Sequence, residues 1–169
     1  KSQGNGVDPQ DVVSKYGADV LRLWVSSADY HSDVKMSNEI LKQLSEAYRK
    51  IRNTARFVMG NLFDFDPSKD MVKIDDLSEL DKWALAKLNE VIDKTLKGYE
   101  TFEFYNVFHA IQKFCIVDMS NFYLDVLKDR LYVEKADGFK RRSAQTVIYM
   151  VLDALVRMIS PVLSFTAEE

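Results

Sequence analysis

A stripe of cationic side chains in the first third of the chain is well suited to binding phosphate. A helix would place four polar residues on one face, because they recur at spacings of three and four positions: Arg49, Arg52, Asn53 and Arg56. Lys50 flanks them, and no acidic residue occurs between Glu46 and Asp64. Arginine suits phosphate because its planar guanidinium donates two hydrogen bonds at once. Most solvated helix faces mix charges of both signs, so this stripe predicts an anionic ligand, with an ordinary solvated face as the alternative.

Two further basic groups occur late in the chain. Arg141 and Arg142 fall at the start of a predicted helix, where an outside anion would relieve the unfavourable interaction of cations with the helix dipole. The alternative is a fraying end whose charges are screened by salt. Lys128 and Arg130 end the preceding helix, which suits the dipole without any ligand. Tyr132 offers a ring on which a base can stack, although loop tyrosines more often pack on their own protein.

The first residues combine a cation, a hydroxyl and glycine, in Lys1, Ser2, Gly4 and Gly6. Glycine lets backbone N–H groups face a ligand, so this segment could approach a polyphosphate closely. A plain flexible end is the alternative interpretation.

Composition excludes several classes of protein. The chain has 169 residues, a net charge of -3 and one cysteine, Cys115. The acidic balance argues against gripping nucleic acid by bulk charge, so any RNA contact depends on local patches. A single cysteine allows no internal disulfide, and neither His31 nor His109 has partners at the spacing of metal ligands. No apolar run reaches the length of a membrane span. We therefore expect no metal site, no membrane association and a reducing, cytoplasmic setting.

Four long helices must position these groups. Apolar residues spaced by three and four predict a helix from a Ser37 N-cap and a second from a Ser78 N-cap. A third is predicted over about residues 104–128, and a fourth from about Phe139 to a stop at Pro161. Short connections between them predict an all-α, antiparallel four-helix-type bundle over residues 37–169. We expect Trp83, Phe108 and Phe122 in its core.

Both ends of the chain carry helix signals. Asp8 and Pro9 predict the N-cap and first residue of a short helix. Thr166 and Glu169 form a capping box, which predicts a helix starting at Thr166. A chain that ends on a helix start is expected to be a piece of a longer protein.

Several blocks resemble class I aminoacyl-tRNA synthetases. Residues 1–5 are similar to the end of the Lys-Met-Ser-Lys-Ser loop of that class, and residues 17–24 to the segment that follows it in the isoleucyl, valyl and leucyl enzymes. Further blocks resemble isoleucyl-tRNA synthetases in particular, at residues 48–54, 120–132, 141–147 and 160–169. The valyl and leucyl relatives typically carry Trp-Tyr where Phe122-Tyr123 stands.

The resemblance implies that the parent protein joins isoleucine to tRNA(Ile) with ATP and Mg²⁺ through an isoleucyl-adenylate, as a cytoplasmic monomer. Lys1 and Ser2 would contact the ATP phosphates. Residues 1–36 would form the end of the catalytic loop and a stem-contact linker, and residues 37–169 the anticodon-binding bundle. The predicted tRNA-binding residues are the basic, amide and aromatic side chains described above: Arg49, Lys50, Arg52, Asn53, Arg56, Lys128, Arg130, Tyr132, Arg141 and Arg142.

The catalytic nucleotide-binding fold, the editing domain and the zinc-binding segment of the family have no counterpart in this sequence. We therefore expect the fragment alone to be catalytically inactive, and to bind no ATP, metal, DNA or membrane. Two alternatives stay open. One is the same region of a valyl or leucyl enzyme, against which the Phe122-Tyr123 block argues. The other is a helical protein–protein interaction module, which would expose an apolar stripe and carry no basic one.

Overall fold

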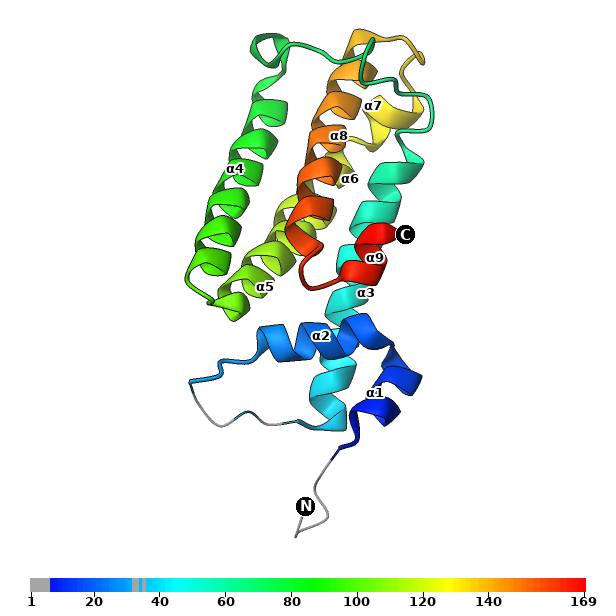
Figure 1. Cartoon of the computed structure of the whole chain (residues 1–169). Coiled ribbons are helices and arrows are strands. Elements are labelled where there is room, and N and C mark those ends of the chain that lie inside the picture. The colour runs from blue at the N-terminus through cyan, green and yellow to red at the C-terminus, as the bar shows by residue number, and fades with distance from the viewer. Residues whose placement is uncertain (1–6, 32–33, 35) are drawn as a thin grey trace.

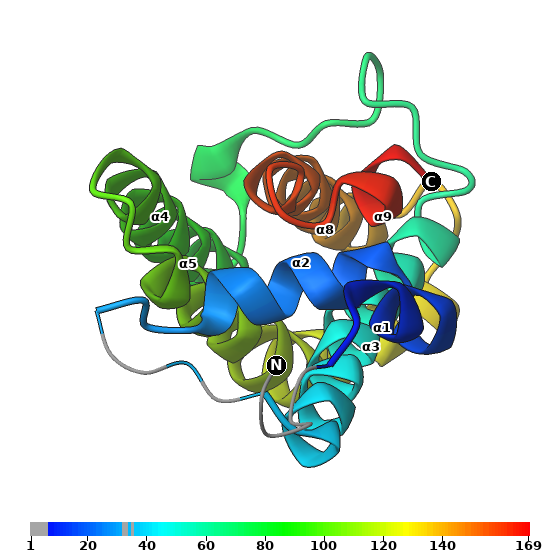
Figure 2. The same ribbon diagram turned by 60° about the horizontal axis from the view of Figure 1, so that its bottom comes forward.

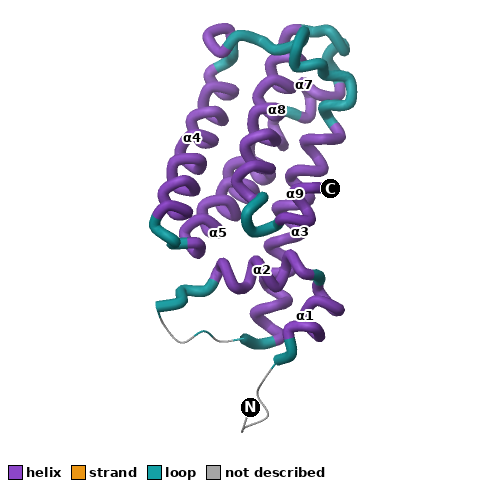
Figure 3. The backbone as a smooth tube through the Cα atoms, viewed as in Figure 1, coloured by secondary structure: helices purple, strands orange, loops and turns teal. Residues whose placement is uncertain are grey.

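The computed structural model describes residues 7–31, 34 and 36–169, and this part of the chain is built from helices without a strand (Figures 1 and 3). Four helical rods make up most of it. They are α3 (Asn38–Gly60), α4 (Glu79–Glu100), a composite rod of α5 (Phe104–Lys113), the π-helix η2 (Phe114–Tyr123) and α6 (Leu124–Val126), and α8 (Phe139–Ile159). In Figure 1, α3 and the composite rod run one way, and α4 and α8 run the other. The predicted all-α antiparallel bundle is confirmed.

Side chains cap the first two long helices where the sequence predicts. Ser37 accepts a hydrogen bond from the backbone N–H of Ile40, and Ser78 accepts one from that of Asp81 at 3.2 Å. The Ser78 hydroxyl also donates to the Asp81 carboxylate at 2.8 Å. These bonds satisfy N–H groups that have no partner within the helix. The short 3₁₀ helix η1 (Ile74–Asp76) lies in the loop just before Ser78.

The bundle core contains two of the three aromatic residues expected in it, and the prediction for the third is wrong. Phe108 is buried, and Trp83 is half-buried against the core. Phe122, however, is 45% exposed, whereas its neighbour Tyr123 is fully buried. The Phe122 ring packs edge-to-face on Trp83, with centroids 5.0 Å apart, so it covers the core from outside.

The π-helix explains why Tyr123 points inward instead of Phe122. One series of buried residues in the composite rod recurs every fourth position, at Ile111, Cys115, Met119 and Tyr123, and continues to Leu127 just beyond it. In an α-helix a step of four residues overshoots one turn by about 40°, so such a series would drift around the helix. The wider turns of a π-helix, with their i→i+5 hydrogen bonds, offset this drift. The placement of Phe122 in the core holds only for one continuous α-helix, so the change of pitch makes it wrong.

Two short helices, α1 (Pro9–Tyr16) and α2 (Ala18–Ser27), lie across one end of the bundle (Figure 2). The predicted cap of α1 is confirmed, since the Asp8 carboxylate accepts the N–H of Gln10 at 2.8 Å. Gly17 joins the two helices with a φ of 90°, which glycine adopts without steric cost. Helix α2 packs against α3, α5 and α9, so it forms part of one packed structure with the bundle. The predicted division at residue 36 stays a prediction.

The remaining helices are α7 (Lys128–Tyr132) and α9 (Ser164–Glu168). The prediction that Thr166 caps a new helix is wrong, because α9 begins at Ser164 and Thr166 lies inside it. The carboxylate of Asp19, on α2, accepts the backbone N–H of Thr166 at 2.8 Å and its hydroxyl at 2.6 Å. A side chain distant in sequence therefore does the capping that the local pattern assigned to Thr166.

Candidate nucleic-acid interface

The α3 stripe presents free cations to solvent. Arg49, Lys50, Asn53 and Arg56 are all exposed, and within the described residues their side chains make no hydrogen bond or ion pair. Helix α3 holds them outward because its opposite face is buried, with Leu44, Ile51 and Val58 in the core. Their guanidinium and ammonium groups therefore remain free to meet an external anion.

Arg52 differs from the other members of the stripe. Its guanidinium donates to both carboxylate oxygens of Glu169, and its side chain keeps 34% of its accessible surface. The hydrogen bond to this carboxylate raises the pKa of Arg52 above its ordinary value. Arg52 thus lies on the predicted face, but it already has an anionic partner within the chain.

The arginines at the start of α8 have carboxylate partners within the protein, which balance their charge at this helix end, and their predicted tRNA contacts stay predictions. One Arg141 nitrogen donates to both carboxylate oxygens of Asp64, at 2.9 and 3.0 Å, and another donates to the Leu131 carbonyl. Arg142 donates to the Asp64 carbonyl at 2.8 Å and lies 3.5 Å from the Asp70 carboxylate. The alternative of a frayed end is wrong, because Arg141 is only 9% exposed.

Asp64 is the centre of this network. Besides Arg141, it accepts a hydrogen bond from the amide of Gln145 at 2.7 Å. Burial alone would raise the pKa of the Asp64 carboxyl, but the hydrogen bonds from Arg141 and Gln145 outweigh it and hold the pKa below its ordinary value. The network ties the loop after α3 to the first turn of α8, so its arginines stabilise the fold.

Arg130 and Lys128 are also paired within the protein. Arg130 forms a two-pronged ion pair with Asp81, at 2.8 Å to each oxygen, and the Tyr123 hydroxyl donates to the same carboxylate at 2.6 Å. Burial would raise the pKa of Asp81, but the bonds from Arg130, Tyr123 and Ser78 lower it. Lys128 pairs with Asp125 at 2.7 Å, one turn away on the surface. The predicted RNA contacts of Lys128 and Arg130 stay predictions.

Exposed aromatic rings lie at the end of the bundle near Arg141. Tyr132 is 63% exposed, so its ring is available for stacking, as its place in the sequence suggests. Phe63 is 81% exposed and lies 5.9 Å from the Arg141 guanidinium, and Phe139 is 59% exposed two residues before it. Sequence reasoning missed Phe63 and Phe139. The sequence did contain a signal for Phe63, because an apolar ring in a polar loop that follows a basic helix is a candidate for stacking on a base.

Three further expectations concern ATP, metal ions and membranes. Lys1 and Ser2, the predicted ATP-binding residues, lie outside the described residues. Within residues 7–31, 34 and 36–169, no group of three or more histidine, cysteine or acidic side chains is placed to hold a metal ion. None of the helices described is both long and apolar enough to span a bilayer. The expectations about ATP, metals and membranes stay predictions.

Comparison with known families places this bundle in a class. Residues 81–169 match the family described as "Anticodon-binding domain of tRNA ligase". Residues 1–37 match "tRNA synthetases class I (I, L, M and V)". The chain therefore belongs to the anticodon-binding domain family of tRNA ligases.

Its similar relatives are isoleucine–tRNA ligases. The chain is 60% identical over all 169 residues to that of Syntrophotalea carbinolica, 56% to that of Thermoanaerobacter sp. and 58% to that of Carboxydothermus hydrogenoformans. It spans 18% of the length of the first two relatives. The resemblance to isoleucyl-tRNA synthetases is confirmed, and these similarities favour it over the valyl or leucyl alternative and over a protein–protein interaction module.

Proposed function

We propose that this chain is a tRNA-binding part of an isoleucine–tRNA ligase, and that it holds the anticodon arm on the outer face of α3. The observation that carries the proposal is a group of neighbouring exposed cations on that helix that have no partner among the described residues: Arg49, Lys50 and Arg56. The other arginines predicted to bind tRNA each have a carboxylate partner inside the protein: Arg52, Arg130, Arg141 and Arg142. Because the chain has a net charge of -3, attraction to RNA depends on these few groups.

The parent enzyme would attach isoleucine to tRNA(Ile) in the cytoplasm, using ATP and Mg²⁺ through an aminoacyl-adenylate, and it would act as a monomer. The match of residues 1–37 to class I synthetases supports this assignment. Lys1 and Ser2 would approach the ATP phosphates there. Without the nucleotide-binding part of the parent, they cannot position a reacting phosphate. We therefore expect the isolated chain to catalyse no isoleucine-dependent exchange between ATP and pyrophosphate.

Contacts on the proposed face fall into two kinds. Arginines bind phosphates strongly but carry no sequence information, whereas bases are distinguished by hydrogen bonds to their edges. Asn53 is exposed between Arg49 and Arg56 and is neutral, so it is the member of the stripe suited to reading a base edge. Unpaired bases of the anticodon loop would stack on the exposed rings at the end of the bundle, Phe63 and Tyr132.

Salt dependence of tRNA binding tests the proposal. In the parent ligase, we expect Arg49→Gln and Arg56→Gln each to weaken tRNA(Ile) binding. Each should also lower the slope of log affinity against log salt by roughly 0.7–0.9, because a variant that neutralises one phosphate fewer releases one counterion fewer. Arg157→Gln is a matched control, since Arg157 is an exposed α8 arginine paired with Asp153. Filter binding at several salt concentrations measures all three.

The opposite outcome is equally clear. If Arg49→Gln and Arg56→Gln leave affinity and salt slope as in wild type, the stripe is a solvated helix face and the parent binds tRNA elsewhere. Isoleucine-dependent ATP–pyrophosphate exchange should be unchanged in every variant, because that reaction does not require the anticodon arm. A parallel loss of exchange activity would indicate damage to the fold instead of weaker RNA binding.

A further inference from the structure

Two charged side chains of α2 bind opposite ends of the turn between α8 and α9. Arg22 donates through Nε to the Val162 carbonyl at 2.7 Å and through a terminal nitrogen to the Pro161 carbonyl at 2.8 Å. Asp19, one turn earlier, accepts the N–H and the hydroxyl of Thr166. Arg22 therefore donates to carbonyl groups that follow α8. Asp19 accepts from a backbone N–H at the start of α9, where N–H groups have no partner within the helix.

We call this pair the α2 clamp (Asp19 and Arg22); Asp19 lies within the packed structure, whereas Arg22 holds the turn from the surface. Asp19 is only 6% exposed, and the apolar residues next to it on α2, Val20 and Leu23, are buried. Thr166 in turn lies 2.9 Å from the Tyr48 hydroxyl of α3, so the clamp reaches a third element. Hydrogen bonds are directional, so this arrangement fixes the angle and register of α2 on the bundle more narrowly than apolar contact would.

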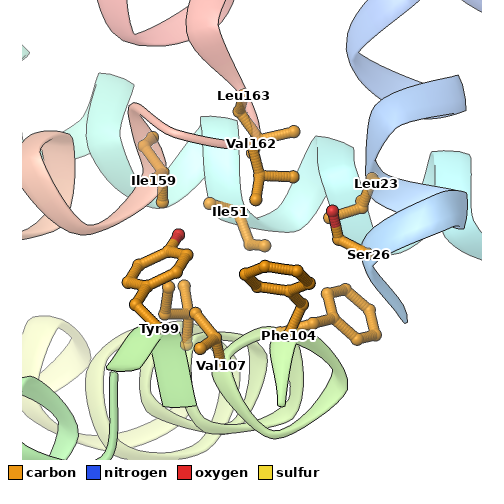
Figure 4. Close-up of a pocket in the computed structure, with 11 residues that line it drawn as sticks. Leu23, Ser26, Ile51, Tyr99, Phe104, Val107, Ile159, Val162 and Leu163 are labelled. Carbon is orange, nitrogen blue, oxygen red and sulfur yellow. The ribbon is translucent and has the colours of Figure 1, made fainter. Parts of the chain in front are cut away.

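Beyond the clamp, a small cavity lies beside α2. Figure 4 shows Leu23 and Ser26 of α2 facing a cavity of about 20 Å³, with Ile159 and Val162 on the other side. That is room for about one water molecule, and the cavity lining is almost entirely apolar. The first half of α2 is thus held by directional bonds, and the second half by apolar contacts next to this cavity. The clamp is therefore the contact that sets the orientation of α2.

We propose that Asp19 and Arg22 are positioning residues that couple the segment containing α1 and α2 to the anticodon-binding bundle. This inference rests on the proposed function. Residues 1–37 match class I synthetases and residues 81–169 match the anticodon-binding family, and the clamp joins the two stretches. In the parent, it fixes how tRNA held on the bundle is oriented toward the catalytic part. Adenylate formation needs no tRNA and so does not depend on the clamp.

Separate assays of the two half-reactions test the coupling in the parent ligase. Asp19→Asn keeps the shape of the side chain but replaces one acceptor oxygen with an NH₂ donor. Arg22→Gln removes the guanidinium that donates to the two carbonyl groups. We expect kcat for tRNA aminoacylation to fall roughly tenfold to a hundredfold, the order of loss caused by a misplacement of about 1 Å. ATP–pyrophosphate exchange should stay at the wild-type rate. Asp11→Asn on exposed α1 is the matched control, with no expected change in either assay.

Further measurements separate coupling from simple destabilisation. Thr166→Val removes the hydroxyl that Asp19 accepts, so its effect on aminoacylation should not add to that of Asp19→Asn. If Asp19→Asn does not fold, Arg22→Lys keeps the charge and carries the test. Parallel loss of both half-reactions and of thermal stability would reduce the clamp to a structural contact, and unchanged aminoacylation would overturn the proposal. The dissociation constant for tRNA reports the proposed function separately, and it should not change in the clamp variants.

Discussion

Arg56 on α3 and Arg141 on α8 carry the same guanidinium in opposite surroundings. Arg56 is exposed and has no partner among the described residues, whereas Arg141 is 9% exposed and bound to Asp64 by two hydrogen bonds. Both belong to basic groups of the sequence, Arg56 to the stripe on α3 and Arg141 to the consecutive run Lys140-Arg141-Arg142. The difference arises from the loop after α3, which brings Asp64 to the start of α8.

The comparison separates two uses of arginine in one small bundle. A buried arginine with a carboxylate partner fixes a loop to a helix, because removing either partner leaves an uncompensated charge. An exposed arginine adds little to stability and is free to bind an outside anion. Stability measurements and RNA-binding measurements should therefore divide these residues into two groups.

The largest expected effect is on stability, at Arg141. Replacing it with alanine leaves the Asp64 carboxylate without its main cation in a mostly buried site. We expect the free energy of unfolding to fall by about 3–5 kcal/mol, the usual cost of breaking a buried ion pair. Chemical denaturation of Arg141→Ala measures this, with Arg157→Ala as the exposed control on the same helix. A loss at Arg141 no larger than at Arg157 would contradict the internal role.

A smaller effect with a defined pH dependence is expected for Asp64→Asn. The substitution should cost about 1–3 kcal/mol at neutral pH, because hydrogen bonds to a charged acceptor become bonds to a neutral one. The pKa of Asp64 is lower in the folded chain than its ordinary value of about 3.9. The unfolded state therefore takes up the proton first as pH falls, and the stabilisation is full above about pH 4.

Urea denaturation of wild type and Asp64→Asn between about pH 3 and pH 7 measures how this stabilisation changes with pH. The difference in unfolding free energy should be constant near neutral pH and should shrink below about pH 4. Asp66 and Asp81 also have lowered pKa values, but both are present in the two proteins and cancel in the difference. A difference that grows on acidification would mean that Asp64 is not stabilised by its cations.

Local sequence signals predicted the helices well. The caps at Ser37 and Ser78 are short-range features that a few neighbouring residues determine. The exposure of Arg49 and Arg56 follows from the same periodicity, because they lie opposite the apolar face of α3. The fold class and one face of the candidate site could therefore be read from the chain.

Contacts between distant segments could not be predicted in this way. The partners of Arg130 and Arg141 are 49 and 77 residues away along the sequence, and no local pattern indicates them. The cap that Asp19 supplies to α9 spans 147 residues. Phe122 illustrates a different failure, because one π-helical segment rotates every residue that follows it. Each error arose from a single long-range contact or a change in helical pitch.

The smallest expected effect sharpens the comparison most. Arg56→Gln should change the free energy of unfolding by no more than about 0.5 kcal/mol, because the side chain is exposed and has no partner to lose among the described residues. The same substitution in the parent is expected to lower the salt dependence of tRNA binding. Arg141→Ala should produce the reverse pattern, with a large stability loss and a cost to tRNA binding only through unfolding. Denaturation and salt-dependent binding of both variants, measured below their unfolding transitions, compare the two directly. If Arg56→Gln destabilises the chain as Arg141→Ala does, Arg56 serves the fold as well, and the division between structural and RNA-facing arginines fails.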